Sequence, residues 1–104
     1  MGDEDILEML KTDLQISTTK YDMFLTNIIK LAKAEIEEEG IVLKKLVENG
    51  EDIGLKIEDG MLVQMYAAYL YRKRRGENVA MPRMLRYALN NRLLSQKGGS
   101  WWME

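Results

Sequence analysis

The side chains that most often carry out catalysis are scarce in this 104-residue chain. It contains no histidine and no cysteine, which removes the commonest general base, a strong nucleophile and the usual zinc ligands. Serine occurs only at Ser17, Ser95 and Ser100, none of them in a nucleophile-elbow pattern. No glycine-rich phosphate-binding motif is present. The sequence therefore predicts a protein that is not an enzyme and that has no catalytic residue, metal site or cofactor.

Charged side chains are the remaining candidates for chemistry, and they are unevenly distributed. Residues 1–71 hold 15 acidic and 7 basic side chains, whereas residues 72–104 hold 2 acidic and 8 basic ones. Such asymmetry indicates interaction with a charged partner, either nucleic acid or a second copy of the chain. The densest acidic group is Glu35, Glu37, Glu38 and Glu39, and the densest basic group is Arg72, Lys73, Arg74 and Arg75.

Apolar spacing and punctuation predict the elements that must position these charges. Helices are expected over residues 5–14, 20–39, 59–74 and 82–96. The stripe expected to face the core from the second helix comprises Tyr21, Phe24, Leu25, Ile28, Ile29, Ala32 and Ile36. The fold class predicted is mostly α, a four-helix single domain over residues 1–97.

Residues 41–58 separate the second and third helices and are harder to interpret. Two short strand-like runs flank Asn49-Gly50, a strong turn signal. Either a short β-hairpin or an extended loop is compatible with this pattern.

The third helix carries a run of almost continuous apolar residues, 61–71, which is about half of a membrane span. No membrane partner is expected. A helix that is apolar on nearly every face must be covered on nearly every face. Either the domain packs closely around it, or another subunit covers part of it.

The segment 98–104 is expected to be a flexible C-terminal tail, and it carries Trp101 and Trp102. Two exposed tryptophans at a chain end are unfavourable for solubility. They are interpreted as an anchor that docks on a neighbouring chain, and the alternative is that they dock on the body of their own chain.

Four stretches carry a resemblance to a known family. They are LKTDLQIS at residues 10–17, YDMFLTNIIKLA at 21–32, MYAAYLYRKR at 65–74 and MPRMLRYALNNRL at 81–93. Together they resemble the head–tail connector or adaptor proteins of tailed phages, including the QLRG group formerly labelled putative DNA-packaging proteins. The QLRG tetrapeptide itself is absent, and residues 91–94 stand at the comparable place.

The resemblance implies a structural viral protein located in the virion at the head–tail junction and assembled in the bacterial host cytoplasm. By this resemblance the chain is expected to form a homo-oligomeric ring, about twelvefold. A repeated contact between unlike patches is compatible with that expectation, since it closes into a ring when the rotation allows. The ring lies under the portal protein, extends the DNA channel and offers a platform to the next connector or tail component. DNA passing through it is a transient, non-specific partner.

Candidate residues follow from the ring hypothesis and from the charge pattern. The candidates for the subunit interface are Glu35, Glu37, Glu38, Glu39, Tyr66, Tyr69, Leu70, Arg72, Lys73, Arg74, Arg75, Trp101 and Trp102. The candidates for facing the channel or DNA are Arg83, Arg86 and Arg92.

The alternative function is a small helical DNA-binding protein that uses the basic region 72–92. Residues 74–92 could form a helix–turn–helix whose second helix reads the major groove. Against this, the sequence pI of the whole chain is near 5.3, and compact DNA-binding domains are usually basic.

Overall fold

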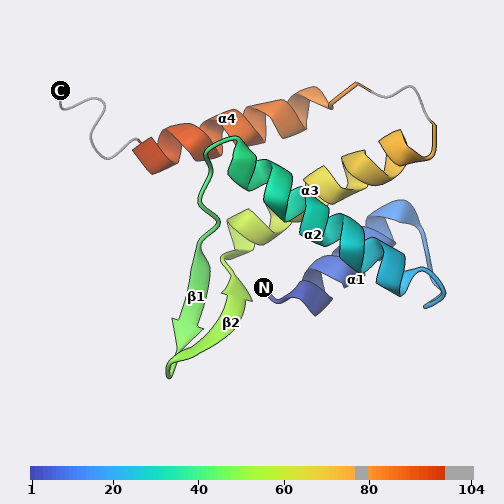
Figure 1. Ribbon diagram of the computed structural model, residues 1–104, viewed down its shortest axis with the longest axis horizontal. Helices are drawn as coiled ribbons and strands as arrows, with labels where there is room; N and C mark the ends of the chain where they lie inside the picture. Colours follow the sequence, from blue (N-terminus) through green and yellow to red (C-terminus); the bar gives the residue numbers. More distant parts are fainter. Residues whose placement is uncertain (77–79, 98–104) are drawn as a thin grey trace.

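Four helices and one β-hairpin make up the described part of the chain, residues 1–76 and 80–97, in this computed structural model (Figure 1). In chain order the elements are α1 (Asp3–Leu14), α2 (Asp22–Glu38), β1 (Lys45–Glu48), β2 (Glu51–Leu55), α3 (Ile57–Arg74) and α4 (Arg83–Lys97). Figure 1 shows α2 crossing α3 in the middle of the molecule, with α4 along one side, α1 on the other and the hairpin projecting from the helices. The predicted mostly helical single domain is confirmed.

The helix ends differ from the predicted ones by at most two residues. The first helix begins at Asp3 instead of residue 5. Asp3, Glu4 and Asp5 therefore lie inside its first turn. Gly2 occupies the N-cap position in an extended conformation, and its N–H donates to the Asp5 carboxylate at 3.1 Å. Asp5 therefore supports the helix start from the third helical position, where the positive end of the helix dipole favours a negative charge.

The core forms around α3, which α1, α2 and α4 contact from different sides. Its buried apolar residues are Leu62, Val63, Tyr66, Ala67 and Ala68, and they pack against Ile6 and Leu10 of α1, the α2 residues Leu25, Ile28, Ile29, Ala32 and Ile36, and Leu85 and Leu89 of α4. The enclosure is incomplete, because Met61 of α3 is 48% exposed and Met65 is half-buried. One strip of the apolar helix thus remains uncovered within one chain.

The segment between α2 and α3 forms a hairpin, which decides between the two structures left open by the sequence. β1 and β2 pair in antiparallel register from Lys45 opposite Leu55 to Glu48 opposite Glu51. Asn49 and Gly50 both have positive φ, 53° and 80°, as a tight hairpin turn requires. The strand residues are mostly exposed, so the hairpin is held mainly at its base.

The base of the hairpin is joined to residue 1. Met1 N donates to Leu55 O at 2.6 Å, and Leu55 N–H donates to Met1 O at 2.8 Å. Gly54 makes this approach possible: its φ is +108°, and a Cβ there would overlap with the Met1 carbonyl. The backbone of residue 1 thus extends the two-stranded sheet beside β2.

A buried ion pair joins α3, α4 and the segment that precedes β1. Asp59 is 2% exposed and accepts hydrogen bonds from Arg92 Nε at 2.7 Å and from Arg92 Nη2 at 3.2 Å. The Lys44 N–H also donates to Asp59 at 2.8 Å, and Arg92 donates to the carbonyl of Val42. Burial by itself raises the pKa of Asp59, but the hydrogen bonds and positive charges of Arg92 and Lys44 outweigh it, so the pKa lies below its ordinary value.

Replacing Asp59 with asparagine should lower the free energy of unfolding by about 3 kcal/mol, because Arg92 would lose its charged partner in a buried site. Chemical denaturation followed by circular dichroism measures this. Asp52→Asn is the matched control, since Asp52 pairs with Lys45 at 3.9 Å and its side chain is 54% exposed. That change should cost less than about 1 kcal/mol, and equal losses in both variants would contradict the assignment.

The same pair should make stability depend on pH in acid. The folded-state pKa of Asp59 is lowered from 3.8, so the ionised pair contributes fully above that pH and is lost as the pH falls through the lower folded value. The difference in unfolding free energy between the wild type and Asp59→Asn should therefore shrink as the pH is lowered below 3.8. Denaturant titrations from neutral pH into acid measure it, and a constant difference would refute the proposed linkage.

Gly54→Ala should destabilise the hairpin base more than Gly50→Ala does. Both glycines have positive φ, so both variants carry backbone strain of about 1 kcal/mol or more. Only at Gly54 would the new methyl also meet the Met1 backbone, whereas nothing lies within 4 Å at Gly50. Hydrogen exchange of the Leu55 amide reports the loss of its bond to Met1, and unchanged protection in Gly54→Ala would show that the close approach is unimportant.

Candidate interaction surface

Cations at the C-terminal end of α3 lie over aromatic rings. The Arg74 guanidinium lies 5.2 Å from the centre of the Phe24 ring. Arg75 lies 5.8 Å from the centre of the Tyr71 ring, and the Phe24 and Tyr71 rings meet edge to face at 6.3 Å. These four residues form what is called the basic–aromatic surface below. Its residue types, tyrosine and arginine above all, are those that dominate binding energy at protein interfaces.

The other two cations of this helix end have neighbours within the chain. Arg72 lies 3.7 Å from Asp13 of α1, with both side chains at least 40% exposed. Lys73 lies 5.8 Å from the centre of the Tyr69 ring, one turn earlier in α3. Such exposed contacts contribute about 0–1 kcal/mol each, so they leave these charges available to a partner.

The glutamates at the end of α2, here called the acidic patch, divide into a paired and an unpaired part. Glu39 receives two hydrogen bonds from Arg86 of α4, at 2.8 and 3.3 Å. Glu35 is half-buried, whereas Glu37 and Glu38 are exposed, and no described residue forms an ion pair with these last two. Carboxylates at a helix C-terminus oppose the helix dipole, and Arg86 supplies a compensating cation to Glu39 from within the chain.

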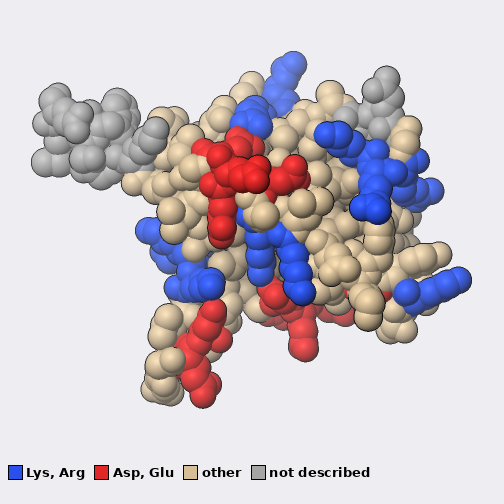
Figure 2. Space-filling view, viewed as in Figure 1, with Lys and Arg blue, Asp and Glu red and all other residues tan. Residues whose placement is uncertain are grey.

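The acidic patch and the region of Arg72–Arg75 are separate but visible from one side. Figure 2 shows acidic side chains gathered over the C-terminal end of α2 and basic ones over the C-terminal end of α3. Phe24, in the basic–aromatic surface, precedes Glu38 by 14 residues in the same helix, a rise of about 21 Å. That distance along the helix is more than twice the screening length of about 8 Å at physiological salt. The two charged regions therefore do not neutralise each other within one chain.

The tyrosines and leucine predicted to supply apolar contacts are less accessible than the cations. Tyr66 is only 6% exposed and belongs to the core, while Tyr69 and Leu70 are half-buried against it. Burial raises the pKa of the Tyr66 hydroxyl, and the nearby charges of Glu35 and Glu39 raise it further. Tyr66 in this conformation thus contributes to the interior rather than to an exposed surface.

Sequence periodicity missed the aromatic side chains that are accessible. Tyr21 and Phe24 were assigned to the core stripe of α2, yet they are 46% and 36% exposed. They lie at the start of α2, just before Leu25, its first buried residue. No local sequence pattern predicts their exposure. It depends on how α2 packs on α3 and on which residues lie opposite the basic end of α3.

Two of the three arginines predicted to face DNA are engaged within the chain. Arg86 pairs with Glu39, whose hydrogen bond raises the pKa of the guanidinium. Arg92 pairs with Asp59, and its side chain is 13% exposed. Arg83 is exposed and, among the described residues, forms no ion pair. Trp101 and Trp102 lie outside the described residues.

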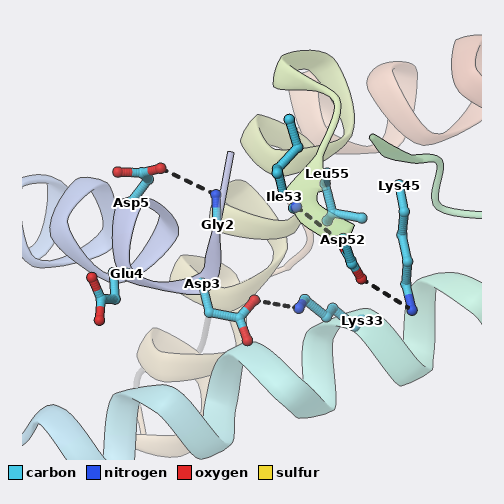
Figure 3. Close-up of a pocket in the computed structure, with 10 residues that line it drawn as sticks. Gly2, Asp3, Glu4, Asp5, Lys33, Lys45, Asp52, Ile53 and Leu55 are labelled. Atoms are coloured by element: carbon cyan, nitrogen blue, oxygen red, sulfur yellow. Dashed lines mark hydrogen bonds and ion pairs between the residues drawn. The ribbon is translucent and has the colours of Figure 1, made fainter. Parts of the chain in front are cut away.

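A cleft of about 610 Å³ lies between the start of α1, α2 and the hairpin (Figure 3). Lys33 of α2 pairs with Asp3, and Lys45 of β1 lies 3.9 Å from Asp52 of β2. Figure 3 shows the Glu4 carboxylate pointing away from these pairs. The cleft is lined by carboxylates, lysines and backbone, and most of its charges are already paired.

The described residues include no group of three or more histidine, cysteine, aspartate or glutamate side chains placed to hold a metal ion. Across residues 1–76 and 80–97, no helix is both long and apolar enough to cross a membrane.

Comparison of the chain with protein-family models, with curated proteins and with solved structures found no match to any of them. The functional argument therefore depends on the residues and on the geometry described above.

Proposed function

We propose that this protein is a structural subunit of a tailed-phage head–tail connector, which works by assembling into a homo-oligomeric ring. In this proposal the ring lies beneath the portal protein in the virion, extends the DNA channel and presents a platform to the next connector or tail component. Assembly takes place in the bacterial host cytoplasm. DNA is a transient partner that passes through the ring without sequence-specific contacts.

The observation that carries the proposal is the pair of unlike charged surfaces near opposite ends of α2, whose residues Phe24 and Glu38 are about 21 Å apart along the helix axis. Each surface has charges without an ion-pair partner among the described residues, Glu37 and Glu38 on one side and Arg74 and Arg75 on the other. Because the two cannot meet within one chain, they favour a head-to-tail contact between copies. Contacts of that kind generate a ring when the rotation closes.

Energetics assign different roles to the two parts of this contact. Exposed ion pairs are worth about 0–1 kcal/mol each, so charge sets geometry and the choice of partner more than strength. Strength would come from aromatic rings beside the cations, for which the exposed Phe24 and the half-buried Tyr71 now replace the buried Tyr66. Arginine can also bind a carboxylate through two parallel hydrogen bonds, which adds orientation to the contact.

The DNA-binding alternative receives less support from α4 than the sequence suggested. Arg86 and Arg92 pair with carboxylates of the same chain, although the Arg86 side chain is still 42% exposed, and Arg83 is the arginine of this helix that forms no ion pair among the described residues. The basic–aromatic surface could still contact phosphates and stack on bases. A gel-shift titration with increasing salt distinguishes the two functions, because tight binding by the monomer would favour the alternative.

Arg74→Glu should weaken oligomer formation, and adding Glu38→Arg to it should partly restore assembly, because the double variant exchanges the two charges of the proposed contact. Analytical ultracentrifugation over a range of protein concentrations at low and high salt measures this as a double-mutant cycle. We expect an interaction energy of about 0.5 kcal/mol or more at low salt, decreasing at high salt.

The matched control is Arg83→Glu, which makes the same charge change at an exposed arginine of α4 outside the basic–aromatic surface. It should leave assembly close to that of the wild type. Strictly additive effects of Arg74→Glu and Glu38→Arg, or a contact that is insensitive to salt, would rule out this interface.

A further inference from the structure

The uncovered strip of α3 forms one wall of an apolar groove of about 420 Å³ between α3 and α4. The residues that line it include Met61, Leu62 and Met65 of α3 and Ala88, Asn91 and Ser95 of α4. A second hollow shares Met65 and continues past Met84 toward Met9 of α1. Methionine is flexible and polarisable, and its sulfur makes favourable contacts with aromatic rings. The lining is therefore suited to an aromatic occupant.

The end of the chain leaves α4 beside this groove. Gln96 fixes the last turn of α4 to the segment that follows α2, because its amide donates to Gly40 O at 2.8 Å and accepts from Val42 N–H at 2.7 Å. Arg92, which also lines the groove, adds its contacts to Asp59 and Val42. Ser95, at the near end of the groove, is two residues from Lys97, where α4 ends. The starting point of the following segment is thus set relative to the groove.

We propose that the groove is the docking site for residues 98–104 of the same chain, with Trp101 and Trp102 packed on the methionines. Gly98 and Gly99 permit a reversal of direction after α4. From Ser95 to Ala88 the groove follows α4 for about 10 Å, and the five residues after the glycines span up to about 17 Å when extended. The tail has the length to cover the groove.

The chemistry of the rim also suits tryptophan. Indole combines a large apolar ring with one N–H donor that requires an acceptor when buried. Glu58 and Asn91 are among the residues that line the groove, and their side-chain oxygens offer such acceptors. Because the linker is only two glycines long, the effective concentration of a chain's own tail is in the millimolar range. At protein concentrations below this value, a chain's own tail therefore occupies the groove in preference to the tail of a second copy.

This inference does not depend on ring formation, and fluorescence tests it directly, because Trp101 and Trp102 are the only tryptophans in the chain. In the native protein their emission should be blue-shifted and their quenching by acrylamide reduced relative to the urea-denatured chain. Both properties should persist on dilution to concentrations at which ultracentrifugation finds only monomer. Emission identical to that of the denatured chain would overturn the proposal, as would a blue shift that disappears on dilution, which would assign the tail to a neighbouring copy.

Met61→Glu should abolish the blue shift and restore full quenching, since it places a charge in the groove at a residue that is already 48% exposed. Met23→Glu makes the same change on α2 at a residue that is 80% exposed and should alter neither property. Circular dichroism checks that both variants remain folded. Unchanged fluorescence in a folded Met61→Glu variant would overturn the assignment of the groove.

Deletion of residues 98–104 provides a second measurement that needs no tryptophan. The uncovered methionine groove should bind the dye anilinonaphthalene sulfonate more strongly than the full chain does. Equal dye binding by the folded full chain and the folded truncated chain would show that the tail does not cover this surface, and would overturn the proposal.

Discussion

The arrangement of the helices depends on the buried pair between Asp59 and Arg92. Asp59 lies in the first turn of α3, where the helix dipole already favours a negative charge, and it binds both Arg92 of α4 and the backbone of Lys44. One carboxylate thus joins three parts of the chain that are far apart in sequence. Buried ion pairs repay their desolvation only when geometry is good and further hydrogen bonds are satisfied. Here Arg92 also donates to Val42 O, and Asp59 also accepts from Lys44 N–H, so both partners make several hydrogen bonds.

This pair determines what α4 can contribute to function. With Arg92 held by Asp59 and Arg86 held by Glu39, α4 is attached through its charged face as well as through Leu85 and Leu89. These two arginines stabilise the fold, whereas Arg83 is exposed, and the densest group of accessible cations lies at the end of α3. The methionine-lined groove runs between α3 and α4 beside Arg92, which is one of its lining residues.

The central helix explains why this small domain has surfaces suited to partners. α3 is apolar on nearly every side, but α1, α2 and α4 leave one strip uncovered at Met61 and Met65. A domain of this size has too few elements to surround one helix completely. The remaining strip, the exposed ring of Phe24, the half-buried ring of Tyr71 and the two separated charged regions are features that association or docking would bury.

Much of the architecture was predictable from the sequence alone, because it depends on local patterns. Apolar spacing located the four helices, and Asn49-Gly50 indicated the hairpin turn, since these signals act over a few residues. Partner choice was decided only by the tertiary structure. Glu39 meets Arg86, 47 residues away, and Asp59 meets Arg92, 33 residues away, and no local pattern specifies which of several cations reaches a given carboxylate. The burial of Tyr66 and the exposure of Phe24 follow from helix packing in the same way, because periodicity defines a face but not how far the neighbouring helix covers it.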